Sequence, residues 1–487
     1  MRSKELFRII KYILLPVIGV VFLILYLRAS AVDVVYSDYI RLINEYLPDV
    51  TDISKLLVPD ILTRIPAAFL ARLVNVRSFG YSVTFDRVLC VIGIAIMAYV
   101  SAMYMYRREI KLKWQIAFYI VLFSLNKWEI LLNGTAWPHM VSFGLFFVSY
   151  QLLDRVWTNE ANSREELTIC VMPLVMLLFA GEYIAAYAGT VMLICLMGLL
   201  LGGANSMAGK REQSLFMSIL ISAAAALLIY MLSRHFAVWE HSGATDMSLL
   251  QVIAADPKFI PKFFIKTFSG AVIGQEVVNS FIPQGAALPN KLVLLIGIIV
   301  MLGYLLALTM YFADDMLEKS IFPLMLIISG IANHVVVTMG RWIFLREDYA
   351  LSSRYGGQFM IGILGMLLIF AMYGRGDRPH RRADEKKRTA CRIAAGIITV
   401  LIAAGNCYTD YREIRIAKYR KANYEKMAEA IVDCESYSED ELLGILEWHK
   451  DPGELYSAIE ILRDNKLNVF RRQSVAADSE QSRGGNQ

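Results

Sequence analysis

Acidic residues in two polar stretches are the first candidates for chemistry in this sequence. Asp38 follows an apolar run and lies between the aromatic residues Tyr36 and Tyr39, and Glu129 follows Lys127 in a polar interruption of apolar sequence. A carboxylate in a partly desolvated pocket gains the basicity that a general base needs. We therefore expect Asp38 and Glu129 to be catalytic, the alternatives being a solvated loop aspartate and an ion pair with Lys127. Four other acidic residues of the first polar segment compete with Asp38, namely Asp33, Asp49, Asp52 and Asp60.

Three arginines in polar segments are candidate ligands of a phosphate. Arg64 begins an amphipathic stretch, Arg341 follows a glycine, and Arg354 precedes Tyr355, which we include in the same binding surface. The planar guanidinium pairs bidentately with phosphate oxygens. Snorkelling of Arg64 from the membrane interface and salt bridges of the other two to nearby acidic residues are the alternatives.

His139 and Glu182 are further candidates for substrate binding. Both occur where polar residues interrupt apolar runs. Irregular backbone exposed to lipid does not occur within the hydrocarbon, so these interruptions line a protein cavity or lie at the interface. A carboxylate at membrane depth marks a functional site by default, and we expect Glu182 to share a cavity with Glu129. An interfacial histidine and a helix cap are the simpler interpretations.

The elements that position these residues are membrane-spanning helices. Of the 487 residues, 56% are hydrophobic and 19% charged, and the mean hydropathy is +0.47, so a soluble protein is excluded. The modest net charge of +5 gives no indication of nucleic-acid binding. Apolar runs predict an all-α polytopic protein with about eleven spans, the first uncleaved. We place them near 9–28, 88–106, 114–126, 138–154, 167–181, 184–202, 214–233, 291–312, 320–339, 357–374 and 392–408.

The distribution of Lys and Arg predicts the orientation of these spans. Short cytoplasmic loops carry an excess of basic residues, and the dense basic runs place the N-terminus inside and the C-terminus outside. Residues 1–408 then form the transmembrane module, with outer loops at 29–87 and 234–290. The first loop has two amphipathic stretches that we expect to lie as helices on the membrane. We expect 409–470 to be a small helical tail outside the membrane and 471–487 to be disordered.

These features together resemble the GT-C superfamily of integral membrane glycosyltransferases, as represented by its poorly characterised bacterial members. The resemblance rests on the acidic stretch around Asp38, the many spans with the N-terminus inside, the outer C-terminal segment and the polar landmarks at Glu129, Arg341 and Arg354. It implies a multi-pass enzyme of the bacterial cytoplasmic membrane with an active site facing outside. Its donor is a sugar linked to polyprenyl phosphate, and its acceptor is an envelope glycan or a lipid among the surrounding membrane lipids.

The resemblance also implies roles for the candidate residues. Asp38 is the base that activates the acceptor hydroxyl, and Glu129 orients the acceptor or the sugar. Arg64, Arg341 and Arg354 are candidate ligands of the departing phosphate. A divalent Mg or Mn ion between the two carboxylates suits such a site. Many GT-C enzymes have two acidic residues in the first outer loop that are adjacent or one position apart, whereas Asp38 has no acidic residue at these neighbouring positions.

Two other classes of function fit parts of the sequence. A transporter or flippase of a lipid-linked or amphiphilic solute would also need short broken spans, outer arginines and a carboxylate in a cavity. A scaffold of an envelope-assembly complex would need no such carboxylate. The absence of paired hydropathy symmetry between the two halves of the sequence favours the transferase over the transporter.

Overall fold

The computed structural model describes residues 2–57, 65–205, 210–234, 243–281, 287–374 and 382–471. Within these ranges the secondary structure is helical, with no strand. Nine helical segments there are long and apolar enough to cross a membrane. The predicted class, an all-α multi-span membrane protein, is therefore confirmed, although the nine segments are two fewer than the eleven spans that we predict.

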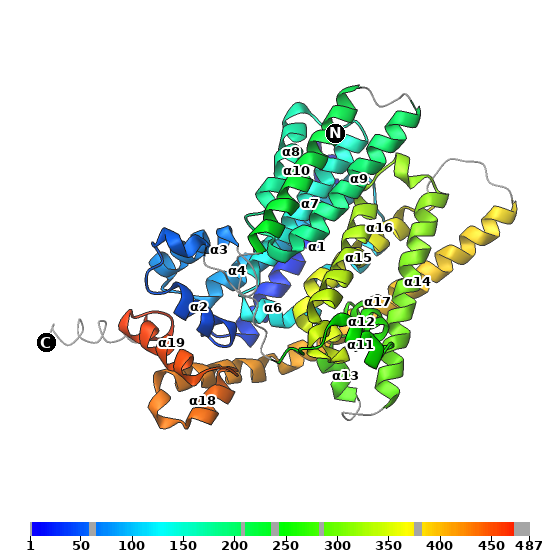
Figure 1. Ribbon diagram of the computed structural model, residues 1–487. Coiled ribbons are helices and arrows are strands. Elements are labelled where there is room, and N and C mark those ends of the chain that lie inside the picture. The colour runs from blue at the N-terminus through cyan, green and yellow to red at the C-terminus, as the bar shows by residue number, and fades with distance from the viewer. Residues whose placement is uncertain are drawn as a thin grey trace.

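Most of the long helices run side by side, as Figure 1 shows. The nine segments lie in α1 (Arg2–Ser30), α4 (Val83–Arg107), α5 (Leu112–Phe123) with α6 (Trp128–Asn133), α9 (Ile184–Asn205), α10 (Lys210–Arg234), α14 (Ala287–Ala313), α15 (Phe322–Arg341), α16 (Gly356–Met372) and α17 (Arg382–Val432). The two other predicted spans correspond to α7 (Trp137–Trp157) and α8 (Ser163–Met176). The first is less apolar than the nine, and the second has only 14 residues.

The helix α16 forms the centre of the bundle. Its span is 94% buried, whereas the span in α10 is 28% buried, and a helix that is apolar on all sides belongs in such an interior. Small residues let α15 approach it closely, because a Cβ atom on Gly330 would lie 2.4 Å from the Cα atom of Gly362. Close approach of backbones at small residues is a common way to pack helices in membranes.

The span that carries Glu129 is broken. The helix α5 ends at Phe123 and α6 starts at Trp128. The Asp410 carboxylate on α17 accepts hydrogen bonds from the Leu125 amide at 2.6 Å and from the Ser124 hydroxyl at 3.2 Å. Irregular backbone at membrane depth requires such protein partners. The break therefore directs Glu129 to one end of the bundle.

The polar segments between the spans contain short helices. The two amphipathic stretches of the first loop form α2 (Asp38–Tyr46) and α3 (Pro66–Val74). Arg64 lies outside the described residues. The segment that we predict as a second outer loop contains α11 (Leu249–Ala255), α12 (Phe259–Gly270) and α13 (Gln275–Phe281).

The C-terminal tail continues directly from the last span. The helix α17 has 51 residues, and it runs past the ends of other helices toward α18 (Glu439–Ile445) and α19 (Pro452–Asp464) (Figure 1). We predict a single helical pattern over 439–462, which the structure divides. Pro452 starts a new helix, because proline suits the first turn, where its missing amide proton has no partner to lose, and Asp451 caps this helix by accepting a hydrogen bond from the Gly453 amide. Residues 472–487, nearly all of the end that we predict to be disordered, lie outside the described residues.

The tail docks on the first polar loop. The Ser37 amide donates to the Leu446 carbonyl at 2.9 Å. Asn468 is 6% exposed, and its side chain accepts from the Val35 amide at 3.2 Å and donates to the Tyr81 carbonyl at 2.9 Å. These contacts place the first loop and the tail on the same side of the bundle.

We expect Asn468→Ala to loosen this docking. The substitution leaves the Val35 amide and the Tyr81 carbonyl without their partner, and each such buried group costs about 1–3 kcal/mol. Thermal unfolding of the detergent-purified protein should shift to lower temperature, and limited proteolysis should cleave the tail sooner. Asn465→Ala is the matched control, because that side chain is exposed and bonds only within its own helix. Equal behaviour of the two variants would contradict the assigned role.

Candidate functional site

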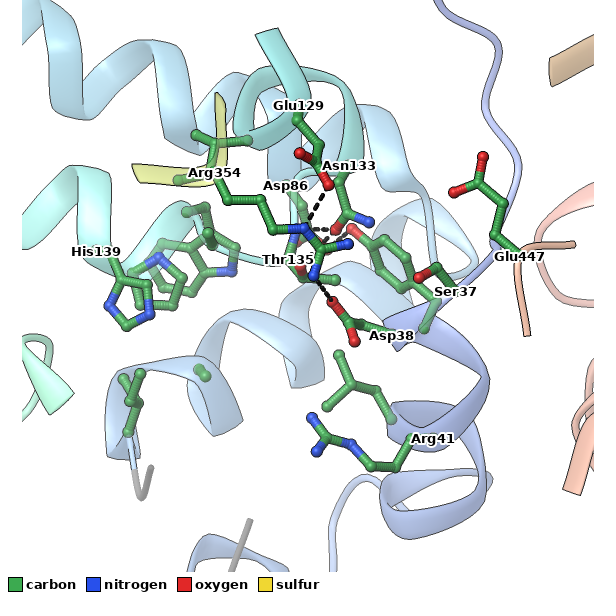
Figure 2. Close-up of a pocket in the computed structure, with 18 of the residues that line it drawn as sticks. Ser37, Asp38, Arg41, Asp86, Glu129, Asn133, Thr135, His139, Arg354 and Glu447 are labelled. Atoms are coloured by element: carbon green, nitrogen blue, oxygen red, sulfur yellow. Dashed lines mark hydrogen bonds and ion pairs between the residues drawn. The ribbon is translucent and has the colours of Figure 1, made fainter. Parts of the chain in front are cut away.

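A cavity of about 700 Å³ lies where the first loop and the tail meet one end of the bundle. Its wall is built from α2, α3, the starts of α4, α6 and α7, the end of α15, the segment between α15 and α16, and residues 447–450 of the tail. Figure 2 shows side chains from these distant segments pointing toward one another. A concave site with convergent polar groups is the default location for binding and chemistry.

The guanidinium of Arg354 joins the two predicted catalytic carboxylates. Its Nη1 atom is 3.7 Å from Asp38 Oδ2, and its Nε atom bonds to Glu129 Oε1 (Figure 2). Ser353 donates a hydrogen bond of 3.0 Å to the other oxygen of Glu129. Arginine is the side chain best suited to hold two carboxylates, because its donors point in several fixed directions. The two predicted groups, acid–base and phosphate-binding, thus form one cluster.

Asp38 is held in place from both sides along the chain. It is the first residue of α2, and Ser37 before it has a φ of 51°, which is unusual for a residue other than glycine. The hydrogen bond from the Ser37 amide to Leu446 fixes this conformation. After Asp38, the Tyr39 hydroxyl donates to Asp86 Oδ2 at 2.8 Å. These contacts fix the position of the Asp38 backbone beside Arg354.

Asp86 is a third carboxylate of the cavity and is missing from the sequence prediction. It lies in the first turn of α4, where an acidic residue is typical of a helix start. Because acidic residues are common at helix starts, the sequence offers no reason to select Asp86 as a site residue. Asp86 lines the cavity, and its contact with Tyr39 places it close to Asp38.

A second predicted arginine, Arg341, lines the cavity beside Tyr355. The guanidinium of Arg341 is 5.7 Å from the ring centre of Tyr355, within the range of a cation–π contact. The rings of His139 and Tyr183 pack edge to face at 4.7 Å, and Glu182 lines the same wall. Every predicted site residue that the structure describes therefore lines one cavity, and Arg64 alone falls outside the described residues.

The tail and α13 contribute carboxylates that sequence reasoning missed. Glu447 lies across the open space of the cavity from Glu129 and Arg354 (Figure 2), and Glu276 of α13 also lines it. Loss of surrounding water raises the pKa of both groups, and the nearby negative charge of Glu129 raises it further. No sequence signal marks either residue, because both occur in ordinary polar segments.

A divalent metal ion does not fit between Asp38 and Glu129. The guanidinium of Arg354 already lies between these carboxylates and balances their charge. Within the described ranges no three His, Cys, Asp or Glu side chains are arranged to hold an ion, whereas Mg and Mn need several oxygen ligands. Arg354 is the counter-ion that these two residues have.

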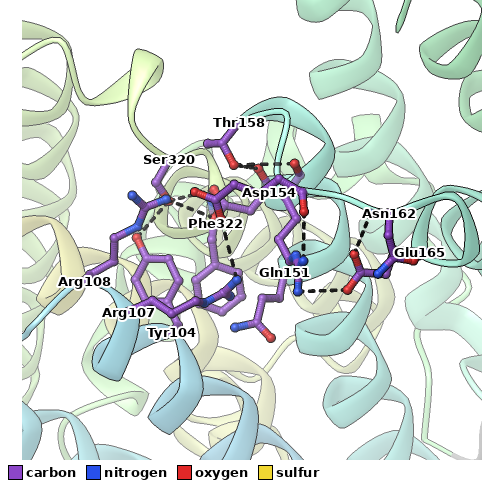
Figure 3. Close-up of polar contacts among 12 residues, drawn as sticks. Tyr104, Arg107, Arg108, Gln151, Asp154, Thr158, Asn162, Glu165, Ser320 and Phe322 are labelled. Atoms are coloured by element: carbon purple, nitrogen blue, oxygen red, sulfur yellow. Dashed lines mark hydrogen bonds and ion pairs between the residues drawn. The ribbon is translucent and has the colours of Figure 1, made fainter. Parts of the chain in front are cut away.

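A separate polar cluster lies at the opposite end of the bundle (Figure 3). The buried carboxylate of Asp154 accepts hydrogen bonds from the Ser320 hydroxyl at 2.7 Å and from the first backbone amides of α15, and it is 3.6 Å from Arg108. This cluster joins α4, α7 and α15. The other ends of α7 and α15 carry His139 and Arg341, so Asp154 joins these two helices at the ends that lie away from the cavity.

No protein-family model, curated protein or solved structure matches this chain significantly. The cavity itself is therefore the basis for assigning a function.

Proposed function

We propose that the protein is a membrane glycosyltransferase that transfers a sugar from a polyprenyl-phosphate donor to an acceptor hydroxyl. The main support is that Asp38 and Glu129, from separate segments of the chain, meet at Arg354 in one cavity at an end of the bundle. Such a site can hold a hydroxyl group, a sugar and a phosphate at the same time.

The residues can be assigned to the steps of this reaction. The acceptor oxygen forms a bond to the anomeric carbon of the sugar while the bond from that carbon to the phosphate oxygen breaks. Asp38 takes the proton of the acceptor hydroxyl, and the electron pair leaves with polyprenyl phosphate. A phosphate leaving group needs stabilisation of its charge more than it needs a proton, so a nearby cation is sufficient.

Arg341 is the better ligand for this phosphate. Arg354 is engaged by two carboxylates, whereas Arg341 has no carboxylate within 4 Å among the described residues and contacts the ring of Tyr355. The charge of Glu182 acts on Arg341, but an arginine that no carboxylate contacts directly keeps its donors for a phosphate. Arg354 then holds Asp38 and Glu129 in their relative positions.

The donor's lipid chain has a route to the cavity along α3. Ile65, Ala68 and Phe69 line the cavity, while Leu70 and Val74 on the same helix are 62% and 49% exposed. An amphipathic helix with such a surface lies at the boundary between headgroups and acyl chains. A polyprenyl chain can therefore stay in the membrane while its phosphate enters the cavity.

We further propose eleven spans, with α7 and α8 as the additional pair and the cavity on the outer side. The helix α7 packs along α4, and its two ends lie at the cavity and at the Asp154 cluster. Short basic segments, such as the one that joins α4 and α5, lie at the Asp154 end, which suits a cytoplasmic surface.

This orientation predicts opposite labelling of two introduced cysteines. In a background with Cys407 replaced by serine, Glu460→Cys in α19 should react with a membrane-impermeant thiol reagent on intact cells or protoplasts. Lys111→Cys, between α4 and α5, should react only after permeabilisation. Both positions are exposed. Labelling of Lys111→Cys alone on intact cells would reverse the proposed orientation.

Asp38→Asn should abolish most sugar transfer. It keeps the size of the side chain and removes the proton acceptor, and general-base catalysis contributes about 10²–10⁴-fold in rate. Transfer from a polyprenyl-phosphate sugar by the purified protein is the measurement. Asp49→Asn is the control, because it is an exposed residue of the same loop that does not line the cavity. Full activity of a well-folded Asp38→Asn protein would show that Asp38 is not the general base.

Arg341→Lys should raise the KM for the donor about tenfold. Lysine keeps the charge but loses the planar pair of donors that matches a phosphate. Arg354→Lys should instead lower kcat, because lysine cannot hold both carboxylates. Arg415→Lys, on the exposed surface of α17, should leave both constants unchanged. An unchanged donor KM in Arg341→Lys would exclude this residue as the phosphate ligand.

A further inference from the structure

One side of the long helix α17 carries a row of polar residues. We call Asp410, Glu413, Arg420 and Tyr424 the α17 row, because their spacing of three, seven and four residues places them on one side of a helix. Glu413 and Tyr424 are buried against the rest of the protein, whereas Tyr411 on the other side is 53% exposed. All four residues of the row lie outside the set that lines the cavity. Any effect of the row on a substrate must therefore pass through other residues.

The centre of the α17 row is a bidentate ion pair. The Nε and Nη2 atoms of Arg420 each donate a hydrogen bond of 2.9 Å to one oxygen of Glu413. The buried hydroxyl of Tyr26, on α1, donates to Glu413 Oε2 at 3.2 Å. Two parallel bonds fix the plane of a guanidinium as well as its position. The guanidinium of Arg420 is therefore held in one orientation by α17 and α1 together.

This guanidinium lies on the segment that carries Glu129. Its central carbon is 3.3 Å from the ring centre of Trp128, within the range of a cation–π contact. Trp128 is the first residue of α6 and directly precedes Glu129. At the other end of the same irregular segment, Asp410 accepts the hydrogen bonds from Ser124 and Leu125. Both ends of the break in this span are thus fixed against α17.

The last residue of the α17 row holds the segment that carries Asp38. The hydroxyl groups of Tyr424 and Tyr36 share a hydrogen bond of 3.0 Å, and the two ring centres are 5.3 Å apart. Tyr36 is buried, and it precedes Asp38 by two residues. Tyr424 follows Arg420 by about one turn of the helix. Neighbouring turns of one helix therefore contact the two segments that carry the candidate carboxylates.

We propose that Arg420 and Tyr424 are positioning residues that set where the carboxylates of Asp38 and Glu129 lie relative to each other. Both carboxylates also meet Arg354, but that side chain is 43% exposed, whereas the contacts with α17 involve buried groups. In an enzyme, a misplacement of about 1 Å caused by a mutation far from the chemistry can cost about 10²-fold in rate. The inference rests on the proposed function in taking sugar transfer as the reaction, but the placement of the two segments does not depend on it.

Arg420→Lys tests the contact with Trp128. Lysine keeps the charge, but it cannot make two bonds to Glu413 and cover the indole ring at once. We expect kcat for sugar transfer to fall about tenfold or more with an unchanged KM for the donor, because Arg420 does not line the cavity. Trp128→Phe keeps an aromatic face and should retain most activity, whereas Trp128→Leu should lose as much as Arg420→Lys. Arg415→Lys, on the exposed side of α17, is the matched control.

A double-mutant cycle separates positioning from a general loss of stability. If Arg420 acts through Glu129, Arg420→Lys should lower kcat less than about twofold in a chain that already carries Glu129→Gln. An equal loss in both backgrounds would overturn this role. Tyr424→Phe and Tyr36→Phe remove the same hydrogen bond, so each should lower kcat by a similar factor and the double variant should lower it no further. An unchanged kcat in both single variants would overturn the role of Tyr424.

Hydrogen exchange followed by mass spectrometry measures the placement of the two segments without sugar transfer. In the detergent-purified protein, Arg420→Lys should speed exchange of the amides of residues 124–133, and Tyr424→Phe should speed exchange of residues 33–40. Arg415→Lys should change neither segment. Unchanged exchange of residues 124–133 in Arg420→Lys would overturn the inference for Arg420, and unchanged exchange of residues 33–40 in Tyr424→Phe would overturn it for Tyr424.

Failure of this inference and failure of the proposed transferase are distinguishable. Faster exchange in Arg420→Lys and Tyr424→Phe, with a wild-type protein that transfers no sugar, would reject the transferase and keep the placement of the two segments by α17. Unchanged exchange and unchanged kcat in variants of an active transferase would reject only the positioning role.

Discussion

The contact of one guanidinium with two carboxylates organises the cavity. Arg354 lies before the central helix α16, Glu129 lies after a break in its span, and Asp38 starts a helix of the first loop. The side chains of Arg354 and Asp38 are 43% and 36% exposed, so water screens these contacts, and they orient the side chains more than they stabilise the fold. The pairing brings three separate segments of the chain together in the wall of one cavity.

The membrane imposes the second constraint, since charges inside the hydrocarbon are costly. The described chain meets it by collecting charged side chains at the two ends of the bundle. Asp154 and its partners join helices at one end, and the Arg354 cluster joins segments at the other. Between them, α16 is buried on all sides among apolar neighbours. The long helices thus connect the Asp154 cluster at one end of the bundle with the Arg354 cluster at the other.

The sequence predicts the helical class, most of the spans and several residues of the cavity, because apolar runs and polar interruptions are local signals. Such local signals select Asp38, Glu129 and Arg354 as candidates. They do not predict that the three side chains form ion pairs, because no local pattern shows which polar segments lie next to each other in the fold. Glu447 and Glu276 were missed because a tail and a short helix reach the cavity only through long-range docking. The break of the predicted tail helix before Pro452 could have been inferred, because Asp451 followed by Pro452 is typical of the start of a helix.

The docking of the tail also has a consequence for the biogenesis of the protein. The cavity takes its first wall from α2, near the start of the chain, and its last from residues 447–450. During synthesis the early segments emerge long before the late ones, so the complete site exists only after the final span has been inserted and the tail has docked. An incompletely inserted chain has Asp38 and Glu129 but lacks the wall opposite them. Completion of membrane insertion therefore controls when the wall of the cavity is first complete.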